Sequence, residues 1–266
     1  MAESTALQGK TALVTGSSSG IGLGIATAFA ARGVNVMLNG IEEPGQVEDV
    51  LGEVRAAATG GAECAYTRAD VSKPDAVRDM VEATAKQFGG LEILVNNAGI
   101  QYVAPIEEFP EAKWDAIIAI NLSSAFHAVK AALPHMRASG YGRVINVCSA
   151  HSLRASPNKV AYVTAKHGLA GLTKTVALET AREDITVNAI SPGYVWTPLV
   201  EKQIPDYAQS NGMTEEEAKH EILDKQASKE FATVEQIAAL AVFLADAPAA
   251  QITGANYPVD GGWTAS

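Results

Sequence analysis

Short apolar runs alternate with longer segments of helical periodicity along the whole chain. The apolar runs predict strands at Thr11–Thr15, Val34–Asn39, Ala62–Asp70, Leu91–Asn96, Arg143–Val147, Ile185–Ser191 and Asn256–Val259. Strands that are buried on both faces of a parallel sheet show such continuous apolar runs, because neither face needs polar side chains. The pattern therefore predicts a mostly parallel, seven-stranded sheet.

Helical patterns fill the segments between these runs. They cover Ile21–Arg32, about Val47–Thr59, a stretch opened by Ser72-Lys73-Pro74, about Glu111–Ser139, Tyr162–Ala181 and Val234 to about Asp246. Gly33 is a typical helix stop, Ser72 with Pro74 suggests a capped helix start, and Thr233-Val234-Glu235-Gln236 is a capping box. Strands that alternate with helices predict a doubly wound, Rossmann-type α/β fold, with helices on both faces of the sheet. No linker or repeat divides it, so we expect a single domain over residues 1–266.

One charge-rich segment breaks the alternation. It covers about residues 196–231, between the sixth strand and the last helix, and Thr214-Glu215-Glu216-Glu217 suggests a helix cap inside it. Long insertions in compact domains are lids, binding loops or passive excursions. Because this one follows the carboxyl end of a strand, where open α/β sheets bind ligands, we favour a helical lid over the substrate.

Composition and charge limit the classes of partner. The chain has 266 residues, 47% of them apolar, which is enough for a buried core, and a net charge of −10. The negative charge argues against nucleic acid and against a strongly acidic carrier protein, but a small anionic substrate needs only local positive charge.

Targeting features and metal sites are also not expected. No apolar run approaches the roughly 18 residues of a membrane span, and residues 1–10 do not resemble a secretory signal. Cys64 and Cys148 both lie in apolar runs, which predicts reduced, buried thiols. We expect a cytoplasmic protein with no membrane partner and no metal site.

A glycine-rich turn, Gly16-Ser17-Ser18-Ser19-Gly20-Ile21-Gly22, joins the first strand to the first helix. Glycines at such a turn let backbone N–H groups approach a pyrophosphate at the positive end of a helix. The spacing G-x-x-x-G-x-G differs from the general G-x-G-x-x-G pattern. The turn alone therefore leaves open a glycine-rich loop that binds nothing.

A second motif suggests proton transfer. Tyr162 and Lys166 are four residues apart, so they lie on one face of the predicted helix. A phenol is a poor base at neutral pH, but a nearby ammonium and an oxidised nicotinamide stabilise its anion. The phenolate then accepts a hydroxyl proton while a hydride leaves. Such pairs also occur by chance on helix surfaces, so the other motifs must decide whether this pair is catalytic.

The chain resembles the short-chain dehydrogenase/reductase family over nearly its whole length. The matching positions are Thr15-Gly16-x-x-x-Gly20-x-Gly22, Asp70-Val71, Asn96-Asn97-Ala98-Gly99, Asn121, Ser149, Tyr162-x-x-x-Lys166 and Pro192-Gly193. The resemblance implies a dinucleotide bound by Thr15, Gly16, Ser18, Gly20, Ile21, Gly22, Asp70, Val71, Asn97, Ala98, Gly99, Tyr162, Lys166, Pro192, Gly193, Val195 and Thr197. It also implies that Ser149 binds the substrate oxygen and that Asn121 holds a relay water beside the lysine.

The residues near the second strand favour NAD over NADP. A 2′-phosphate needs Arg or Lys at that strand end, yet no basic residue occurs between Gly33 and Val54. Glu42 and Glu43 repel a phosphate instead. The acid that NAD enzymes often place at the strand end is absent, because the residue there is Asn39.

Side chains around this core suggest a short carboxylic acid as substrate. Candidate contacts are Gln101, Ser149, His151, Lys159, Tyr162, Trp196, Gln203 and Trp263. A cation, an imidazole and two amides suit a carboxylate, and indoles exclude water and long chains. Taken singly, the glutamines also fit surface positions, the tryptophans core positions, and Lys159 a solvated charge. Together they resemble the bacterial family members that interconvert (R)-3-hydroxybutyrate and acetoacetate, which implies a homotetramer.

Three alternatives remain at this stage. A 3-oxoacyl-thioester reductase shares the four catalytic positions, Asn121, Ser149, Tyr162 and Lys166. It is expected to prefer NADP and to carry basic residues in the glycine-rich turn. A polyol dehydrogenase leaves Lys159 beside His151 without a purpose. A nucleotide sensor on the same scaffold needs no proton relay.

Overall fold

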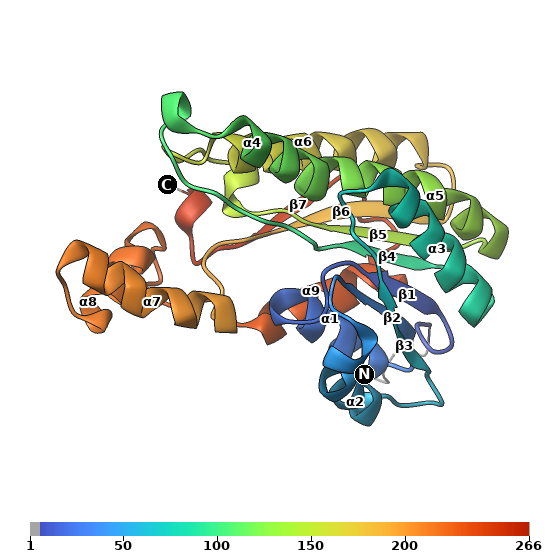
Figure 1. Cartoon of the computed structure of the whole chain (residues 1–266). Helices are drawn as coiled ribbons and strands as arrows, with labels where there is room; N and C mark the ends of the chain where they lie inside the picture. The colour runs from blue at the N-terminus through green and yellow to red at the C-terminus, as the bar shows by residue number, and fades with distance from the viewer. Residues whose placement is uncertain (1–5, 266) are drawn as a thin grey trace.

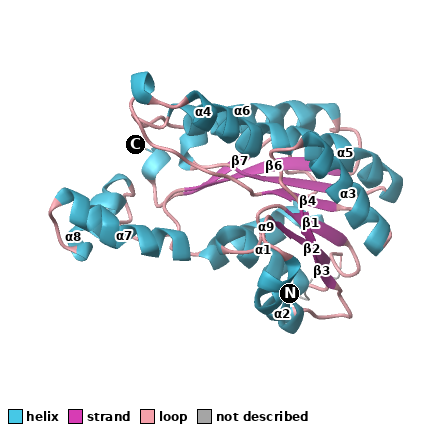
Figure 2. Ribbon diagram, viewed as in Figure 1, coloured by secondary structure: helices cyan, strands magenta, loops and turns pink. Residues whose placement is uncertain are grey.

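Seven parallel strands form one sheet, in the order β3-β2-β1-β4-β5-β6-β7 (Figure 2). The strands are β1 Thr11–Val14, β2 Asn35–Gly40, β3 Cys64–Arg68, β4 Ile93–Asn96, β5 Gly142–Val147, β6 Ile185–Pro192 and β7 Asn256–Val259. This computed structural model describes residues 6–265, without the side chains of Leu199, Gln203, Asp206 and Ser210. The predicted doubly wound fold is confirmed. The strand order reverses between β1 and β4, and such a reversal opens a ligand crevice at the carboxyl ends.

Helices cover both faces of the sheet (Figure 1). One face carries α1 Gly20–Ala30, α2 Glu48–Ala57 and α9 Val234–Ala245, and the other carries α3 Pro74–Phe88, α4 Glu111–Ile118, α5 Ser124–Ser139 and α6 Val160–Glu179. In β1, Ala12 and Val14 pack towards α1 and α9, whereas Leu13 packs towards α3 and α5. Because alternate side chains of a strand point to opposite faces, β1 must be apolar throughout. The free thiols of Cys64 and Cys148 are buried, as expected.

Two of the three expected helix caps are present. The side chain of Thr233 accepts a hydrogen bond from the Gln236 N–H at the start of α9. Thr214 and Glu217 form the second capping box, which opens α8 Glu215–Ile222. The cap expected at Ser72 is wrong, because α3 begins at Pro74 and its N-cap residue, Lys73, makes no side-chain capping bond.

The helical pattern over Glu111–Ser139 is one continuous helix with a change of pitch inside it. Residues Ala119–Ser123 form a π-helical turn between α4 and α5, in which the Ser124 N–H donates to the carbonyl of Ala119. By length and composition this helix is apolar enough to cross a membrane, contrary to the expectation from the sequence. Its apolar residues, including Ala128, Ala132 and Met136, pack into the core formed with α3 and the sheet, which accounts for them.

The charge-rich segment after β6 folds as two helices, α7 Pro198–Asn211 and α8 (orange in Figure 1). They extend beyond the carboxyl ends of the strands rather than lying on a face of the sheet. A small apolar cluster of Ile204, Ala208 and Ala218 joins them to each other. The expected helices are therefore present, and their role as a lid stays a proposal.

Candidate active site

The glycine-rich turn is shaped so that side chains are excluded from its inner surface. Gly16 has a φ of 60°, and a Cβ there would lie 2.9 Å from the Cα of Ala98. A Cβ on Gly22 would lie 2.4 Å from the carbonyl oxygen of Gly16. Since the first backbone conformation favours glycine and the second approach forbids a side chain, both residues must be glycine.

Hydrogen bonds from the end of β4 hold this turn in place. The amide of Asn97 donates to the carbonyls of Thr15 and Gly16 at 2.9 and 2.8 Å. In return, the Thr15 hydroxyl accepts from the N–H groups of Asn97 and Ala98 at 3.0 and 3.1 Å. The turn and the end of β4 therefore form one rigid unit, which fits the expectation that both face the same ligand.

The amino end of α1 suits a pyrophosphate. The helix begins at Gly20, and its N-cap residue Ser19 makes no side-chain capping hydrogen bond. The first N–H groups of a helix lack partners within the helix and carry partial positive charge. Close glycine contacts on one side and these N–H groups on the other fit the diphosphate of a dinucleotide, as the residues Gly16 to Gly22 predict.

The acid beside the end of β2 is Glu42, one of the two acids that the sequence analysis expects to repel a phosphate. Asn39 is buried and hydrogen-bonds to the backbone, since its Oδ1 accepts from the Gly16 N–H at 3.2 Å. The carboxylate of Glu42 instead reaches back to the turn and accepts from the Ser18 hydroxyl at 2.9 Å. The Tyr66 hydroxyl contacts the same carboxylate at 3.4 Å. Burial acts to raise the pKa of Glu42, but hydrogen bonds from backbone groups and Ser18 outweigh it and lower that pKa.

The remaining residues of the expected adenosine side lie at the next strand end. Asp70 and Val71 lie just after β3, separated from it by Ala69. The Ser72 N–H donates to the Asp70 carboxylate at 2.9 Å, and hydrogen bonds from Ser72 lower the pKa of that carboxyl. Asp70 is therefore negatively charged and held in a fixed direction at neutral pH.

Tyr162 and Lys166 lie on α6 beside the end of β5. The Lys166 ammonium lies 5.6 Å from the centre of the Tyr162 ring. It also donates to the carbonyl of Val147 at 2.8 Å, and the lysine is only 3% exposed. Among the described residues no carboxylate pairs with this ammonium.

Asn121 lies in the π-helical turn, and both ends of its side-chain amide bond to Ile100. Its Oδ1 accepts from the Ile100 N–H, and its Nδ2 donates to the Ile100 carbonyl, both at 2.9 Å. The pair fixes the loop that follows Gly99. Single π-helical turns are frequent at functional sites because they redirect one residue of a helix. Here the redirected residue connects the π-helical turn to the loop that follows β4.

Ser149 lies two residues after the end of β5 and is the N-cap residue of a short 3-10 turn, Ala150–Ser152. Its hydroxyl accepts from the His151 N–H at 3.2 Å, which leaves the hydroxyl proton available to a substrate oxygen. His151 itself is 3% exposed, and within residues 6–265 its Nδ1 has no hydrogen-bond partner. Buried nitrogen atoms without a partner are costly, so this one is suited to a ligand.

Aromatic contacts connect His151 to both the phenol and the C-terminus. The ring centre of His151 lies 6.0 Å from that of Tyr162 and 5.1 Å from that of Trp263. Trp263 in turn stacks on Tyr194 at 5.4 Å. The C-terminal turn Trp263–Ala265 is thereby placed against His151, and a contact of Trp263 with the substrate stays a prediction.

Lys159 is the last residue before α6, and it is half-buried. Asn158 before it has a φ of 65°, a left-handed turn that directs the chain into the helix. Burial and the positive charge of Lys225 lower the pKa of Lys159. Burial and the charges of Lys159 and Lys225 also lower the pKa of His151 to about 4, so this imidazole is neutral at pH 7.

Acid pH should therefore destabilise the fold through His151. Its pKa falls from 6.5 to about 4 on folding, so between these values the unfolded chain binds a proton that the folded chain does not. The free energy of unfolding should decrease as the pH falls through this window, by on the order of 3 kcal/mol. In urea unfolding at pH 7 and pH 4.5, H151Q should lose less stability than the wild type, whereas H220Q on the exposed face of α8 should not. Equal losses in all three proteins would contradict the assignment.

The residues expected near the nicotinamide follow β6. Pro192 is the last residue of β6, and a Cβ on Gly193 would lie 2.9 Å from the Cα of Asp260. Val195 forms a parallel bridge with Ala232. Thr197 caps α7, with its hydroxyl accepting from the Val200 N–H at 3.3 Å. Contacts with Asp260 and Ala232 therefore hold the chain segment that joins β6 to α7.

Not every expected substrate contact lies in this cluster. Trp196 faces Phe231 at 5.1 Å and the Lys219 ammonium at 5.5 Å, so its described contacts are with the α7–α8 region. Gln101 is exposed on the loop after β4. The side chain of Gln203 lies outside the described part of the structure. The described structure brings Ser149, Tyr162 and Trp263 around His151, and the charge of Lys159 reaches the same imidazole.

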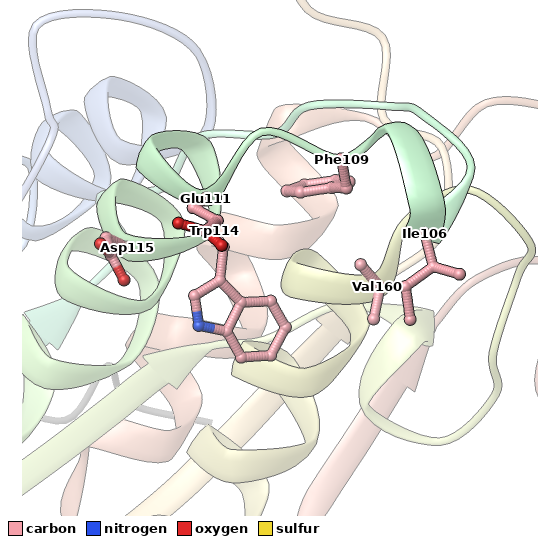
Figure 3. A pocket seen from close by; sticks show the side chains of 6 residues that line it. All are labelled: Ile106, Phe109, Glu111, Trp114, Asp115 and Val160. Carbon is pink, nitrogen blue, oxygen red and sulfur yellow. The ribbon is translucent and has the colours of Figure 1, made fainter.

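A separate pocket lies between α4 and the start of α6 (Figure 3). It is lined by Ile106, Phe109, Glu111, Trp114, Asp115 and Val160. Figure 3 shows the carboxylates of Glu111 and Asp115 on the same helix as Trp114. Two carboxylates at its border repel an acid, and none of the proton-transfer residues lines it. This pocket is therefore not part of the candidate site.

Known proteins match this chain over nearly its full length. A family model described as "Enoyl-(Acyl carrier protein) reductase" matches residues 16–264. A D-beta-hydroxybutyrate dehydrogenase of Rhizobium meliloti is 54% identical, over 96% of this chain and 99% of the relative. A protein of the same name from Cupriavidus necator is also 54% identical, over 97% of this chain and 99% of the relative.

Solved structures agree with the fold. The crystal structure of levodione reductase has a TM-score of 0.89 and 35% identity, and covers 97% of this chain and 99% of its own. A putative 2-deoxy-D-gluconate 3-dehydrogenase from Agrobacterium tumefaciens, with bound NADP, has a TM-score of 0.82 and 35% identity, over 98% of this chain and 99% of its own.

Proposed function

The chain belongs to the short-chain dehydrogenase/reductase family of oxidoreductases, and on this premise we propose that it interconverts (R)-3-hydroxybutyrate and acetoacetate with NAD. The observation that carries the substrate assignment is the buried His151 with its unpartnered Nδ1, close to the half-buried ammonium of Lys159. The names of the two relatives that are 54% identical support the same substrate.

In this proposal the dinucleotide supplies only the acceptor for the hydride of the alcohol carbon. Tyr162, as phenolate, accepts the hydroxyl proton of the alcohol. The Lys166 ammonium stabilises the phenolate electrostatically, since it lies 5.6 Å from the ring centre and has no carboxylate partner among the described residues. The Ser149 hydroxyl donates a hydrogen bond to the same substrate oxygen. We assign the relay of the released proton to Lys166 and to a water held by Asn121.

The carboxylate end of the substrate is assigned to the cluster beside the phenol. The Lys159 ammonium provides the charge, and the neutral His151 imidazole provides a hydrogen bond. Trp263 excludes water, which strengthens both contacts. A charge-assisted hydrogen bond fixes one end of a short molecule, so that the alcohol carbon at its other end faces Tyr162 and the cofactor.

The preference for NAD rests on Glu42. Its carboxylate lies over Gly40, where a Cβ would approach one carboxylate oxygen to 2.1 Å, and Ser18 holds it there. A fixed negative charge at the end of β2 accepts hydrogen bonds from a ribose but repels a 2′-phosphate. Arg68, which donates to the Ile41 carbonyl of the same loop, is already paired with Glu43 at 3.2 Å. The NADP bound by the Agrobacterium neighbour is therefore not carried over to this chain.

The wider setting completes the proposal. We assign the helices of residues 196–231 to a lid that covers the substrate, and residues 1–266 to one catalytic domain. We further propose a cytoplasmic homotetramer, which rests on the resemblance to the hydroxybutyrate-oxidising members of the family.

A direct assay tests this function. Purified protein mixed with (R)-3-hydroxybutyrate and NAD should produce NADH absorbance, and NADP should support a rate at least about 100-fold lower because of the charge on Glu42. The (S) enantiomer is the control and should give no signal. Turnover of a polyol or of a 3-oxoacyl thioester, with none for the acid, would overturn the substrate; faster turnover with NADP would overturn the cofactor.

A further inference from the structure

A second lysine lies beside the proposed carboxylate contact. Lys225 ends the short 3-10 turn Leu223–Lys225, directly after α8. Its ammonium lies 5.4 Å from the centre of the Trp263 indole and donates to the Ser156 hydroxyl at 3.1 Å. Trp263 contacts His151, so Lys225 approaches the same cluster from the lid side.

Lys225 has no partner of opposite charge among the residues that the structure describes. The next lysine along the chain, Lys229, is an instructive contrast, because its ammonium pairs with Asp224 at 2.8 Å. Lys225 follows Asp224 directly, yet its side chain turns to Ser156 and Trp263 instead. Lys225 is exposed, so an anion can reach its ammonium from solvent.

The backbone around Lys225 is fixed. The next residue, Gln226, is completely buried, and its Oε1 accepts from the Tyr194 N–H. Its Nε2 donates to the carbonyl of Glu230. These bonds tie the end of the lid segment to the chain that follows β6. The bonds of Gln226 therefore anchor the backbone next to Lys225.

Its charge reaches both groups that the carboxylate is proposed to contact. Lys225 lowers the pKa of Lys159, after burial, and contributes to the low pKa of His151. Two ammonium groups that repel each other beside an unpartnered imidazole nitrogen are unfavourable without an anion. A carboxylate bound between them relieves this repulsion.

We propose that Lys225 is a second cationic contact for the substrate carboxylate, placed beside Lys159 by the buried Gln226 and by Trp263. This inference rests on the proposed function, because it assumes an acid at the His151 cluster. Arg154 is a less suitable candidate, since its guanidinium is directed to the Thr264 carbonyl at 3.5 Å. The lid thus carries part of the charge that selects the substrate.

The test measures binding of acetoacetate to the enzyme–NAD complex by titration calorimetry. K225M should weaken binding about tenfold, because one charge-assisted contact is lost. K225R should bind within about threefold of the wild type, since the charge is kept. K229M is the matched control and should leave the dissociation constant unchanged. Methyl acetoacetate, which has no carboxylate charge, should bind equally to the wild type and to K225M.

The outcomes separate this inference from the function on which it rests. If the wild type binds acetoacetate and K225M binds it equally well, only the role of Lys225 falls. Weakening of the methyl ester as well, or failure of K225R to restore binding, would assign Lys225 to positioning of Trp263 instead. If the wild type neither binds acetoacetate nor oxidises hydroxybutyrate, both proposals fall. Thermal unfolding of each variant, and K225Q as a second variant, exclude loss of the fold.

Discussion

Replacement of Tyr162 by phenylalanine is expected to abolish turnover while NAD still binds. The change removes one oxygen from α6 and leaves the ring that packs 6.0 Å from His151. No other phenol or carboxylate is assigned to accept the hydroxyl proton, so kcat should fall by at least about 1,000-fold, as for the loss of a general base. Steady-state kinetics measure this loss, and calorimetry with NAD measures the retained binding.

The matched control is Y141F. Tyr141 donates its hydroxyl to the Ala245 carbonyl at 2.5 Å and precedes β5, at the opposite end of that strand from Ser149. This variant should lose stability but retain kcat. If Y162F kept its turnover within a few-fold of the wild type, Tyr162 would not be the base. If Y162F lost NAD binding as well, the defect would lie in the cofactor site.

The second large effect is expected at Lys159. K159A should raise KM for (R)-3-hydroxybutyrate by about 10- to 100-fold, since it removes a charge-assisted hydrogen bond that holds the acid. KM for NAD should stay within about twofold, because Lys159 is assigned to the carboxylate and not to the dinucleotide. The kinetic constants for both substrates are compared in one experiment.

Lys174 supplies the control for this prediction. It is exposed on the same helix, α6, and K174A should change neither KM. Equal weakening of the acid and of NAD in K159A would contradict a contact with the carboxylate. An unchanged KM for the acid would place the acid group elsewhere, and the pairing with Lys225 would then lose its basis.

The sequence predicts the sheet well because the strands are buried on both faces. Runs such as Leu91–Asn96 and Arg143–Val147 allow no other placement, and the observed β4 and β5 differ from them by one or two residues at one end. The capping boxes at Thr214 and Thr233 are equally local, since each depends on two side chains three residues apart. Strands and helix starts can thus be predicted where neighbouring residues in the sequence determine them.

Features that depend on contacts distant in the sequence could not be predicted. The π-helical turn at Asn121 has no pattern in its own residues, because it depends on the bonds to Ile100. Asn39 at the strand end suggested a missing acid, whereas the loop folds back and supplies Glu42 from three residues later. Lys225 is one of many charged residues in its segment, and only the fold brings it to Trp263.

The helices α7 and α8 pack mainly against each other, so their packing is separate from that of the sheet. Their shared contacts, Ile204, Ala208 and Ala218, form a cluster of their own, distinct from the two large clusters that bind the helices to the sheet. Sequence changes in these helices therefore leave the folding of the sheet, the dinucleotide turn and the Tyr162–Lys166 pair largely untouched. If the proposed lid role holds, exchange of this segment should change which acid is accepted and leave the proposed hydride transfer intact.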